Sequence, residues 1–166
     1  KLRSNVSMRH LDVVNVKSAA DMAEAVAARS EASDIVVMCS AVADYTPTHY
    51  STQKVKKSDG ELSIPLARTT DILHTLGMKK KEGQMLVGFS METENLIENS
   101  RKKLSKKNAD IICANTIADG GATGFAVDTN QVTLITETEV ITLPLCTKEE
   151  TADLILSHIV ELQKEK

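Results

Sequence analysis

Short, mostly apolar runs alternate along this chain with longer amphipathic stretches. The runs lie at residues 11–16, 34–39, 85–89 and 110–114. A run with few polar residues is typical of a strand that is buried on both faces, as in a parallel sheet with helices on each side. The alternation therefore predicts an α/β fold built around these strands.

The amphipathic stretches predict four helices. Ser18 is placed to cap the first helix, in which apolar and small side chains recur at helical spacing: Ala19, Met22, Ala23, Val26 and Ala27. Thr69 or Thr70 is expected to cap a short helix that ends near Lys80. A third helix is expected at residues 94–107, acidic early and basic late as the helix dipole favours. The last should begin near Thr147 and bury Ala152, Ile155, Leu156, Ile159 and Val160.

The remaining segments predict loops and hairpins. Residues 40–57 show neither helical nor strand periodicity and are interpreted as a long loop, while residues 61–67 resemble a short strand after a turn at 58–60. Residues 131–135 and 140–143 predict an antiparallel hairpin at the sheet margin, and 119–125 a glycine-rich loop. We expect one domain over residues 1–166, with a Rossmann-like, mostly parallel sheet, helices on both faces and a projecting β-hairpin or flap.

Composition narrows the class of protein. Of 166 residues, 42% are apolar and only 2% aromatic, which favours helices packed closely on a sheet over a β-sandwich. A formal charge of -3 argues against a nucleic-acid or anionic-membrane binder. Cys39, Cys113 and Cys146 are odd in number and lack metal-ligand spacing, and no apolar run approaches the roughly 20 residues that span a bilayer. We therefore expect a cytoplasmic protein without a disulfide framework.

Polar side chains follow three of the predicted strands. Ser40 and Asp44 come after the second run, residues 90–93 after the third and Asn115 after the fourth. In open α/β sheets, ligands occupy the crevice outside the carboxyl ends of the strands. These loops are therefore expected to gather around one site.

Asp44 ends a run of small residues that would let a ligand approach the backbone closely. Its carboxylate could bind ribose hydroxyls or a metal. The alternative is a tight turn in which Asp44 caps nearby N–H groups, and composition alone favours that structural role.

Two groups of lysines could bind phosphate. Lys54, Lys56 and Lys57 could clamp a triphosphate from the long loop, although loop lysines are more often simply solvated. Lys103 and Lys107 stand four residues apart on one helical face and could reach one phosphate group, although cations in a last helical turn also complement the dipole. Local sequence alone favours the solvated loop for the first group and the dipole explanation for the second.

Other common chemistries are not indicated. The four histidines, His10, His49, His74 and His158, share no metal-ligand spacing. The chain carries neither a Gly-x-Gly-x-x-Gly motif nor a P-loop.

Taken together, these loops resemble the bacterial phosphopantothenoylcysteine synthetases. The segment 40–45 (Ser-Ala-Val-Ala-Asp-Tyr) is similar to the family's Ala-Ala-Val-Ala-Asp-Tyr signature, and 54–57 (Lys-Val-Lys-Lys) to its Lys-x-Lys-Lys motif. Residues 70–73, 87–93 and 110–115 resemble its Pro-Asp-Ile-Leu, Val-Gly-Phe-Ala-Ala-Glu-Thr and Asp-x-Ile-x-Ala-Asn segments. The order and spacing of these motifs make the resemblance specific over almost the whole chain.

The resemblance implies a phosphopantothenate-cysteine ligase that acts in coenzyme A biosynthesis. The carboxylate of 4'-phosphopantothenate would attack the α-phosphate of CTP, releasing pyrophosphate and leaving an acyl-cytidylate. The amine of L-cysteine would then attack the carbonyl and release CMP. Mg²⁺ should accompany the triphosphate, because its oxygens suit a hard cation.

Site residues carry over from the matching motifs. Lys54 would be the catalytic cation that supports formation of the acyl-cytidylate. The nucleotide would be bound by Met38, Cys39, Ser40, Asp44, Lys54, Thr70, Asp71, Ile72, Leu73, Phe89, Lys103 and Lys107. The metal ligands are not identified by the motifs.

The chain departs from the family at three places. Ser40 stands where the family has alanine, and Thr70 where it has proline. Nothing here matches the Gly-rich first segment of the family, which carries an asparagine used in product formation. We therefore expect a fragment or a chain lacking that segment, and two alternatives follow: a non-catalytic nucleotide-binding or dimerisation fragment, and an ATP-dependent variant of the ligase.

The resemblance also implies partners. We expect a homodimer, in part because the strand at residues 61–67 could pair across a symmetry axis. In the family, the synthetase is usually fused to a flavin-dependent phosphopantothenoylcysteine decarboxylase.

Overall fold

The fold is known from a computed structural model that describes residues 10–56, 63–116 and 127–165. A five-stranded sheet forms its centre, in the order β1-β4-β5-β7-β8. These strands are β1 (Ile35–Met38), β4 (Met85–Glu92), β5 (Ile111–Thr116), β7 (Val132–Ile135) and β8 (Val140–Thr142). The first three are parallel, and β7 pairs in antiparallel fashion with both β5 and β8. The predicted α/β fold with a mostly parallel sheet is confirmed, as is the antiparallel hairpin at the sheet margin.

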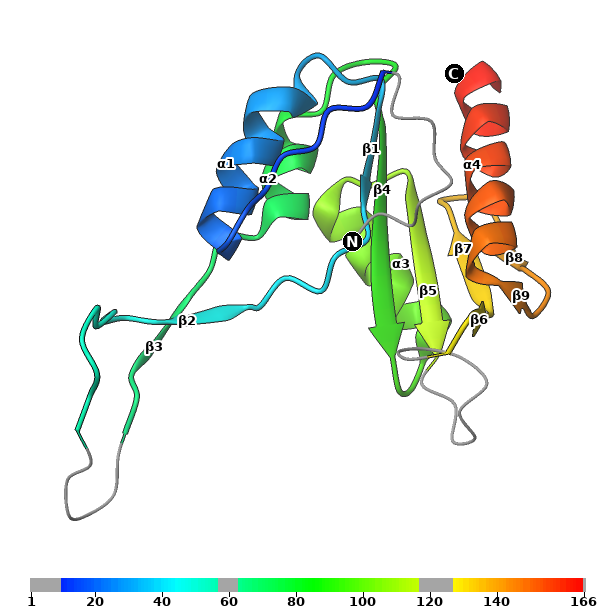
Figure 1. The fold of residues 1–166 in the computed structure, drawn as a ribbon. Coiled ribbons are helices and arrows are strands. Elements are labelled where there is room, and N and C mark those ends of the chain that lie inside the picture. The colour runs from blue at the N-terminus through cyan, green and yellow to red at the C-terminus, as the bar shows by residue number, and fades with distance from the viewer. Residues whose placement is uncertain (1–9, 57–62, 117–126, 166) are drawn as a thin grey trace.

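The helices of the described residues cover the sheet (Figure 1). They are α1 (Ala19–Ser30), α2 (Ile72–Lys79), α3 (Leu96–Lys107) and α4 (Lys148–Glu165). On one face, Ile155 and Ile159 of α4 pack on Met85, Val87 and Ile111. On the other face, α1 and α2 pack on Leu86 and Val36, while Leu104 of α3 packs on Ile112. Helices therefore lie on both faces, as predicted.

The helix starts agree with the sequence in part. Ser18 caps α1 in a reciprocal capping box with Asp21, as its position predicted. The cap of α2 is Asp71, whose side chain accepts from the His74 N–H, and neither Thr69 nor Thr70 has this role. The hydroxyl of Thr69 instead donates to the carbonyl of Ala43 at 2.6 Å. The prediction of a threonine cap was therefore wrong.

Two other helix predictions need correction. The third helix begins at Leu96, two residues later than expected, because Asn95 has a left-handed backbone with φ of 50°. In α4, Ile155 and Ile159 are buried, but Leu156 and Val160 are 50% and 44% exposed and Ala152 is exposed too. The helix buries a narrower stripe than its sequence suggests, because it contacts the sheet along one line of residues spaced by four.

Residues 11–16 do not form the predicted strand. No described strand pairs with this segment, and β1, at the sheet edge, pairs with β4 alone among the described strands. An extended segment becomes a strand only through backbone hydrogen bonds to a neighbouring strand, which this segment lacks among the described residues. Its apolar side chains are therefore partly exposed to solvent. Leu11, Val13, Val14 and Val16 are 37–47% exposed.

A long hairpin arm leaves the sheet after β1. Strand β2 (Tyr45–Pro47) pairs in antiparallel fashion with β3 (Leu66–Arg68), and the arm projects well away from the sheet (Figure 1). The projecting hairpin is thus confirmed, but its second strand begins later than the predicted 61–67. The predicted turn at 58–60 and glycine-rich loop at 119–125 lie outside the described residues. Two short strands, β6 (Thr129–Asn130) and β9 (Cys146–Thr147), form a further pair next to α4.

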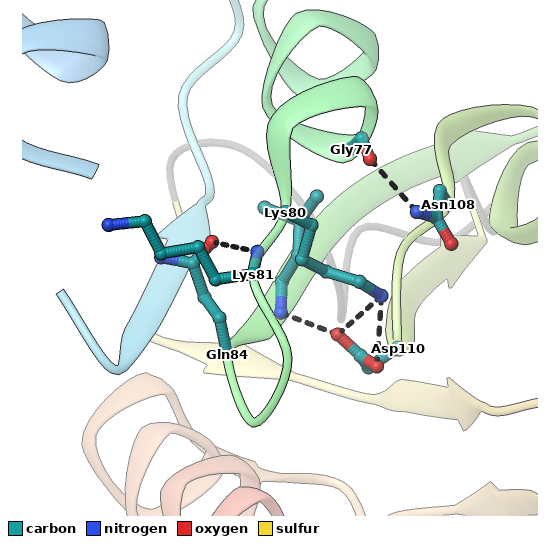
Figure 2. Close-up of polar contacts among 7 residues, drawn as sticks. Gly77, Lys80, Lys81, Gln84, Asn108 and Asp110 are labelled. Atoms are coloured by element: carbon teal, nitrogen blue, oxygen red, sulfur yellow. Dashed lines mark hydrogen bonds and ion pairs between the residues drawn. The ribbon is translucent and has the colours of Figure 1, made fainter. Parts of the chain in front are cut away.

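An ion pair joins Lys80, the C-cap of α2, to Asp110, which immediately precedes β5 (Figure 2). The ammonium of Lys80 donates to both carboxylate oxygens of Asp110 at 3.1 and 3.2 Å, and Asp110 also accepts from the Leu86 N–H at 2.7 Å. Both side chains are largely buried. This pair fixes the start of β5 against β4, at the end of the sheet opposite the polar loops.

None of the described helices is both long and apolar enough to cross a membrane.

Candidate functional site

A cavity of about 200 Å³ lies where β1 ends and α2 begins, on the face of the sheet covered by α2 and α3. We call it the α2–α3 cavity. It is lined by Met38, Ser40, Val42, Ala43, Asp44, Thr69, Thr70, Asp71, Ile72, Leu73, Phe89, Lys103, Lys107 and Ile112. All of the predicted nucleotide-binding residues line this cavity, except Cys39 and Lys54. Residues from three separate motifs therefore meet at one place.

The loop after β1 is joined to the segment before α2. The Thr69 N–H donates to the Asp44 carbonyl at 2.9 Å, beside the bond from its hydroxyl to Ala43. These bonds hold Asp44 close to the N-terminus of α2. Among the residues that the structure describes, none donates to the Asp44 carboxylate. The exposed carboxylate is therefore available to a ligand, and the alternative in which it caps neighbouring N–H groups is not seen.

Lys107 is paired with Asp71. Its side chain is 16% exposed, whereas that of Asp71 is 49% exposed. Partial burial raises the pKa of the Asp71 carboxyl, but the Lys107 ammonium and the His74 N–H outweigh this effect and bring the pKa below its usual value. Asp71 is therefore ionised at neutral pH and has two roles, since it caps α2 and holds Lys107.

Lys103 is paired with Glu92, at the carboxyl end of β4. The two charged atoms are 2.6 Å apart, and the other carboxylate oxygen of Glu92 accepts from Asn99 at 3.3 Å. The Glu92 side chain is only 12% exposed. Sequence reasoning gave no role to Glu92 or Asn99. The signal was present, because Ser90 and Glu92 stand two apart in the strand and so share the face that meets α3.

Close packing of α2 on α3 sets the positions of both lysines. A Cβ added at Gly77 would come within 1.8 Å of the Lys107 carbonyl oxygen. The Asn108 side chain donates to the Gly77 carbonyl at 2.9 Å, and the His74 ring bonds to the Lys106 carbonyl at 3.0 Å. Only glycine permits this approach, and these bonds fix the last turn of α3 beside Asp71.

Gly88 has a similar function on the sheet. A Cβ there would lie 2.5 Å from Leu73 and 3.1 Å from Ile112. Its absence lets Leu73, which lines the cavity, pack directly on β4. The Val-Gly-Phe sequence of this strand thus shapes the cavity floor.

Lys54 lies on the projecting arm, outside the α2–α3 cavity. It is exposed, as is Lys56, and Lys57 lies outside the described residues. The structure therefore does not bring the predicted catalytic lysine together with Asp44, Lys103 and Lys107.

A second cavity, of about 610 Å³, opens on the α4 face of the sheet. It is lined mostly by apolar groups and shares Ser40 and Phe89 with the first. Cys39 and Asn115 lie here, together with Asn130 and Lys148, which sequence reasoning missed. Asn130 donates to the Asn115 side chain at 3.3 Å.

In the parts of the chain that the structure describes, no three His, Cys, Asp or Glu side chains are grouped to hold a metal ion. Burial raises the pKa of the Cys113 thiol to about 12, so this cysteine is protonated and unreactive at neutral pH.

The fold and the cavities define a class: α/β proteins with a small-ligand site at the carboxyl ends of parallel strands. Within it, the family described as DNA/pantothenate metabolism flavoprotein C-terminal domain matches residues 3–162. The chain belongs to this family. The predicted resemblance is thereby confirmed at the level of the family.

Individual relatives agree. The chain is 46% identical over 155 residues to the coenzyme A biosynthesis bifunctional protein CoaBC of Bacillus subtilis (strain 168), covering 93% of this chain and 38% of that protein. It is 41% identical over 157 residues to a cysteine/cysteine sulfinic acid decarboxylase of an unknown prokaryotic organism, covering 94% and 44%. The chain thus spans less than half the length of these curated relatives.

A solved structure also matches. The C-terminal domain of a coenzyme A biosynthesis bifunctional protein CoaBC superposes with a TM-score of 0.73 at 40% identity. The match covers 92% of this chain and 66% of that one.

Proposed function

We propose that this chain is the nucleotide-binding part of a phosphopantothenate-cysteine ligase of coenzyme A biosynthesis. It would join 4'-phosphopantothenate to L-cysteine through an acyl-cytidylate, with CTP converted to CMP and pyrophosphate. The observation that carries the proposal is the α2–α3 cavity, where Asp44, Lys103 and Lys107 meet although they come from distant motifs. The similarity to CoaBC proteins supports the same reaction class.

In this proposal the protein positions the reactants and compensates charge. A carboxylate oxygen is a poor leaving group, so the acid must first become a mixed anhydride with the nucleotide. Lys107 and Lys103 would face phosphate oxygens, while Asp44 would bind the nucleotide from the loop. Thr70 to Leu73 and Phe89 would complete the pocket, and the backbone near Met38, Cys39 and Ser40 would meet the nucleotide.

The charge of the cavity explains why further cations are needed. Two carboxylates, Asp44 and Asp71, oppose two ammonium groups, Lys103 and Lys107, so the lining has no net positive charge. A triphosphate therefore needs other positive charge. Mg²⁺ bound to its phosphate oxygens would supply one part, and Lys54 of the arm the other. Lys54 would arrive by movement of the arm or from the arm of a second subunit.

The arm also supports the proposed homodimer. Its described residues expose large apolar side chains, with Tyr50 90%, Ile64 61% and Leu66 56% accessible. A patch of this kind on a projecting hairpin suits contact with a second copy. A fused or associated flavin-dependent phosphopantothenoylcysteine decarboxylase remains part of the proposal, as the bifunctional relatives suggest.

The direct test is turnover by the purified chain. CTP, 4'-phosphopantothenate and magnesium should yield pyrophosphate, and added cysteine should yield CMP. Replacing CTP by ATP distinguishes the ATP-dependent variant, since faster pyrophosphate release with ATP would correct the nucleotide. Absence of pyrophosphate release with both nucleotides would contradict the ligase proposal.

A second candidate is a nucleotide-binding or dimerisation module without catalysis. It is favoured by the position of Lys54, which is exposed and does not line the α2–α3 cavity. CTP binding without pyrophosphate release would support the module.

A further inference from the structure

Each lysine of the α2–α3 cavity already has a carboxylate partner from another element. Lys107 pairs with Asp71 at the start of α2, and Lys103 pairs with Glu92 at the end of β4. An incoming phosphate must therefore either displace these carboxylates or share the ammonium groups with them. The two pairs differ in the feature that decides between these outcomes, which is the burial of the carboxylate.

Asp71 can release its lysine at small cost. Its side chain is 49% exposed, so water can solvate the carboxylate once Lys107 turns toward a phosphate. It also keeps the hydrogen bond from the His74 N–H, which does not depend on Lys107. This pair is suited to exchange.

Glu92 cannot release Lys103 so easily. Its side chain is 12% exposed, and its second oxygen is held by Asn99, which in turn donates to the Glu94 carbonyl at 3.0 Å. Just below, the hydroxyls of Ser90 and Ser100 join β4 to α3 at 3.1 Å. A carboxylate in this position that lost its ammonium would be left largely desolvated, which is strongly unfavourable.

We propose that Glu92 is a positioning residue for the nucleotide: it stays paired with Lys103 in the bound state and directs that ammonium into the cavity, whereas Asp71 gives up Lys107. This inference rests on the proposed function, since it assumes a nucleotide in the α2–α3 cavity. Glu92 itself need not touch the ligand. Lys103, which is 44% exposed, keeps N–H donors free for the ligand while one is held by Glu92.

A double-mutant cycle tests the inference, with CTP and magnesium titrated into the chain by calorimetry. Glu92→Gln keeps the shape and an acceptor for Asn99 but removes the charge that holds Lys103. We expect the Kd for CTP to rise about tenfold in Glu92→Gln and in Lys103→Met. The double variant should bind no worse than Lys103→Met alone, because Glu92 acts through Lys103.

The matched control is Glu98→Gln. Glu98 pairs with Lys102 at 2.7 Å on the exposed face of the same helix, so the same change there should leave CTP affinity unaltered. If Glu92→Gln binds CTP as tightly as Glu98→Gln, the inference is overturned. It is also overturned if Glu92→Gln weakens binding equally with and without Lys103, because that result indicates a general structural effect.

A second readout requires no nucleotide. Limited acetylation followed by mass spectrometry should show Lys103 more reactive in Glu92→Gln than in the unmodified chain, because the amine is no longer held in a shielded ion pair. Unchanged reactivity would contradict the positioning role. If the chain binds no CTP at all but Lys103 reactivity rises as expected, the proposed function fails while the Glu92–Lys103 coupling stands.

Discussion

The burial of its two side chains determines how much each ion pair contributes to folding stability. Lys80–Asp110 is the most enclosed pair in the described chain, with side chains 15% and 10% exposed, whereas Glu98–Lys102 is 66% and 70% exposed. An enclosed pair adds little when intact but is costly to break, because the remaining charge has no solvent. An exposed pair is worth little in either direction.

We predict that Asp110→Ala lowers the free energy of unfolding by about 3 kcal/mol, since it leaves the Lys80 ammonium without its carboxylate and the Leu86 N–H without its acceptor. Glu98→Ala should leave it nearly unchanged, because its pair with Lys102 is exposed to solvent. Urea denaturation of both variants gives the comparison. Equal losses would show that the enclosed pair has no special role.

Asp71 makes stability depend on pH in the acid range. Its folded-state pKa is lowered below the ordinary value of 3.8, so the unfolded chain binds a proton first as the pH falls. The stability that Asp71 contributes is complete above that value and is lost as the pH drops toward the lower folded-state pKa.

We therefore predict that Asp71→Asn, which can still cap α2, shows a shallower loss of stability below pH 3.8 than the unmodified chain. The measurement is the urea midpoint as a function of pH. A variant with the same acid dependence as the unmodified chain would indicate that Lys107 does not stabilise the Asp71 carboxylate.

At the scale of elements, the contact between α2 and α3 decides the geometry of the cavity. Gly77 lets the two helices approach so closely that the last turn of α3 lies beside the start of α2. Lys103 and Lys107 reach the cavity because of this approach, although they belong to a different element from Asp71.

We predict that Gly77→Ala costs about 2 kcal/mol of stability, because its Cβ meets the Lys107 carbonyl and the helices must separate. The same shift should weaken CTP binding by moving Lys107. Met78→Ala, at the adjacent position with its side chain 76% exposed, is the control and should change neither quantity. A folded Gly77→Ala with unaltered CTP affinity would contradict this role of the contact.

At the level of elements, the sequence predicted best the strands that the chain's own helices cover on both faces. The runs at 85–89 and 110–114 became β4 and β5 because both of their faces are covered by the chain's own helices. The run at 11–16 is also mostly apolar, but no described strand pairs with it, so the sequence pattern predicted a strand that lacks a partner. Burial on α4 was overestimated for a similar reason, since sequence shows how wide an apolar stripe is but not how much of it the sheet covers.

At the scale of the whole molecule, the projecting arm is the feature that does not pack against the sheet. It leaves the core after β1 and returns at β3 (Figure 1). Lys54 and several exposed apolar side chains lie on it, and Lys54 does not line the α2–α3 cavity. A second copy of the chain would both cover those side chains and offer a route for Lys54 to reach a nucleotide.

We predict that the chain is a dimer in solution and that Leu66→Asp shifts it to monomer, because a charge would replace an apolar group in the contact. Lys56→Ala, on the same arm, is the control. Light scattering over a range of concentrations measures both. A chain that is monomeric at high concentration, or a Leu66→Asp variant that stays dimeric, would contradict the proposed arm contact.

Only some of the residues at the candidate site could be predicted from the order of the motifs in the sequence. The family resemblance, which rests on the order and spacing of the motifs, implied the predicted residues that line the α2–α3 cavity, all but Cys39 and Lys54. The motifs did not predict Glu92 as the partner of Lys103, since that contact depends on how β4 packs against α3. Nor could they place Lys54, whose position depends on the course of a long arm.

A crystal structure of the chain with CTP and magnesium would test the proposed site most directly. We expect the nucleotide in the α2–α3 cavity with its phosphates beside both lysines, Lys107 being released from Asp71 and Lys103 still paired with Glu92. A nucleotide bound instead in the apolar cavity next to α4, or away from both cavities, would contradict it.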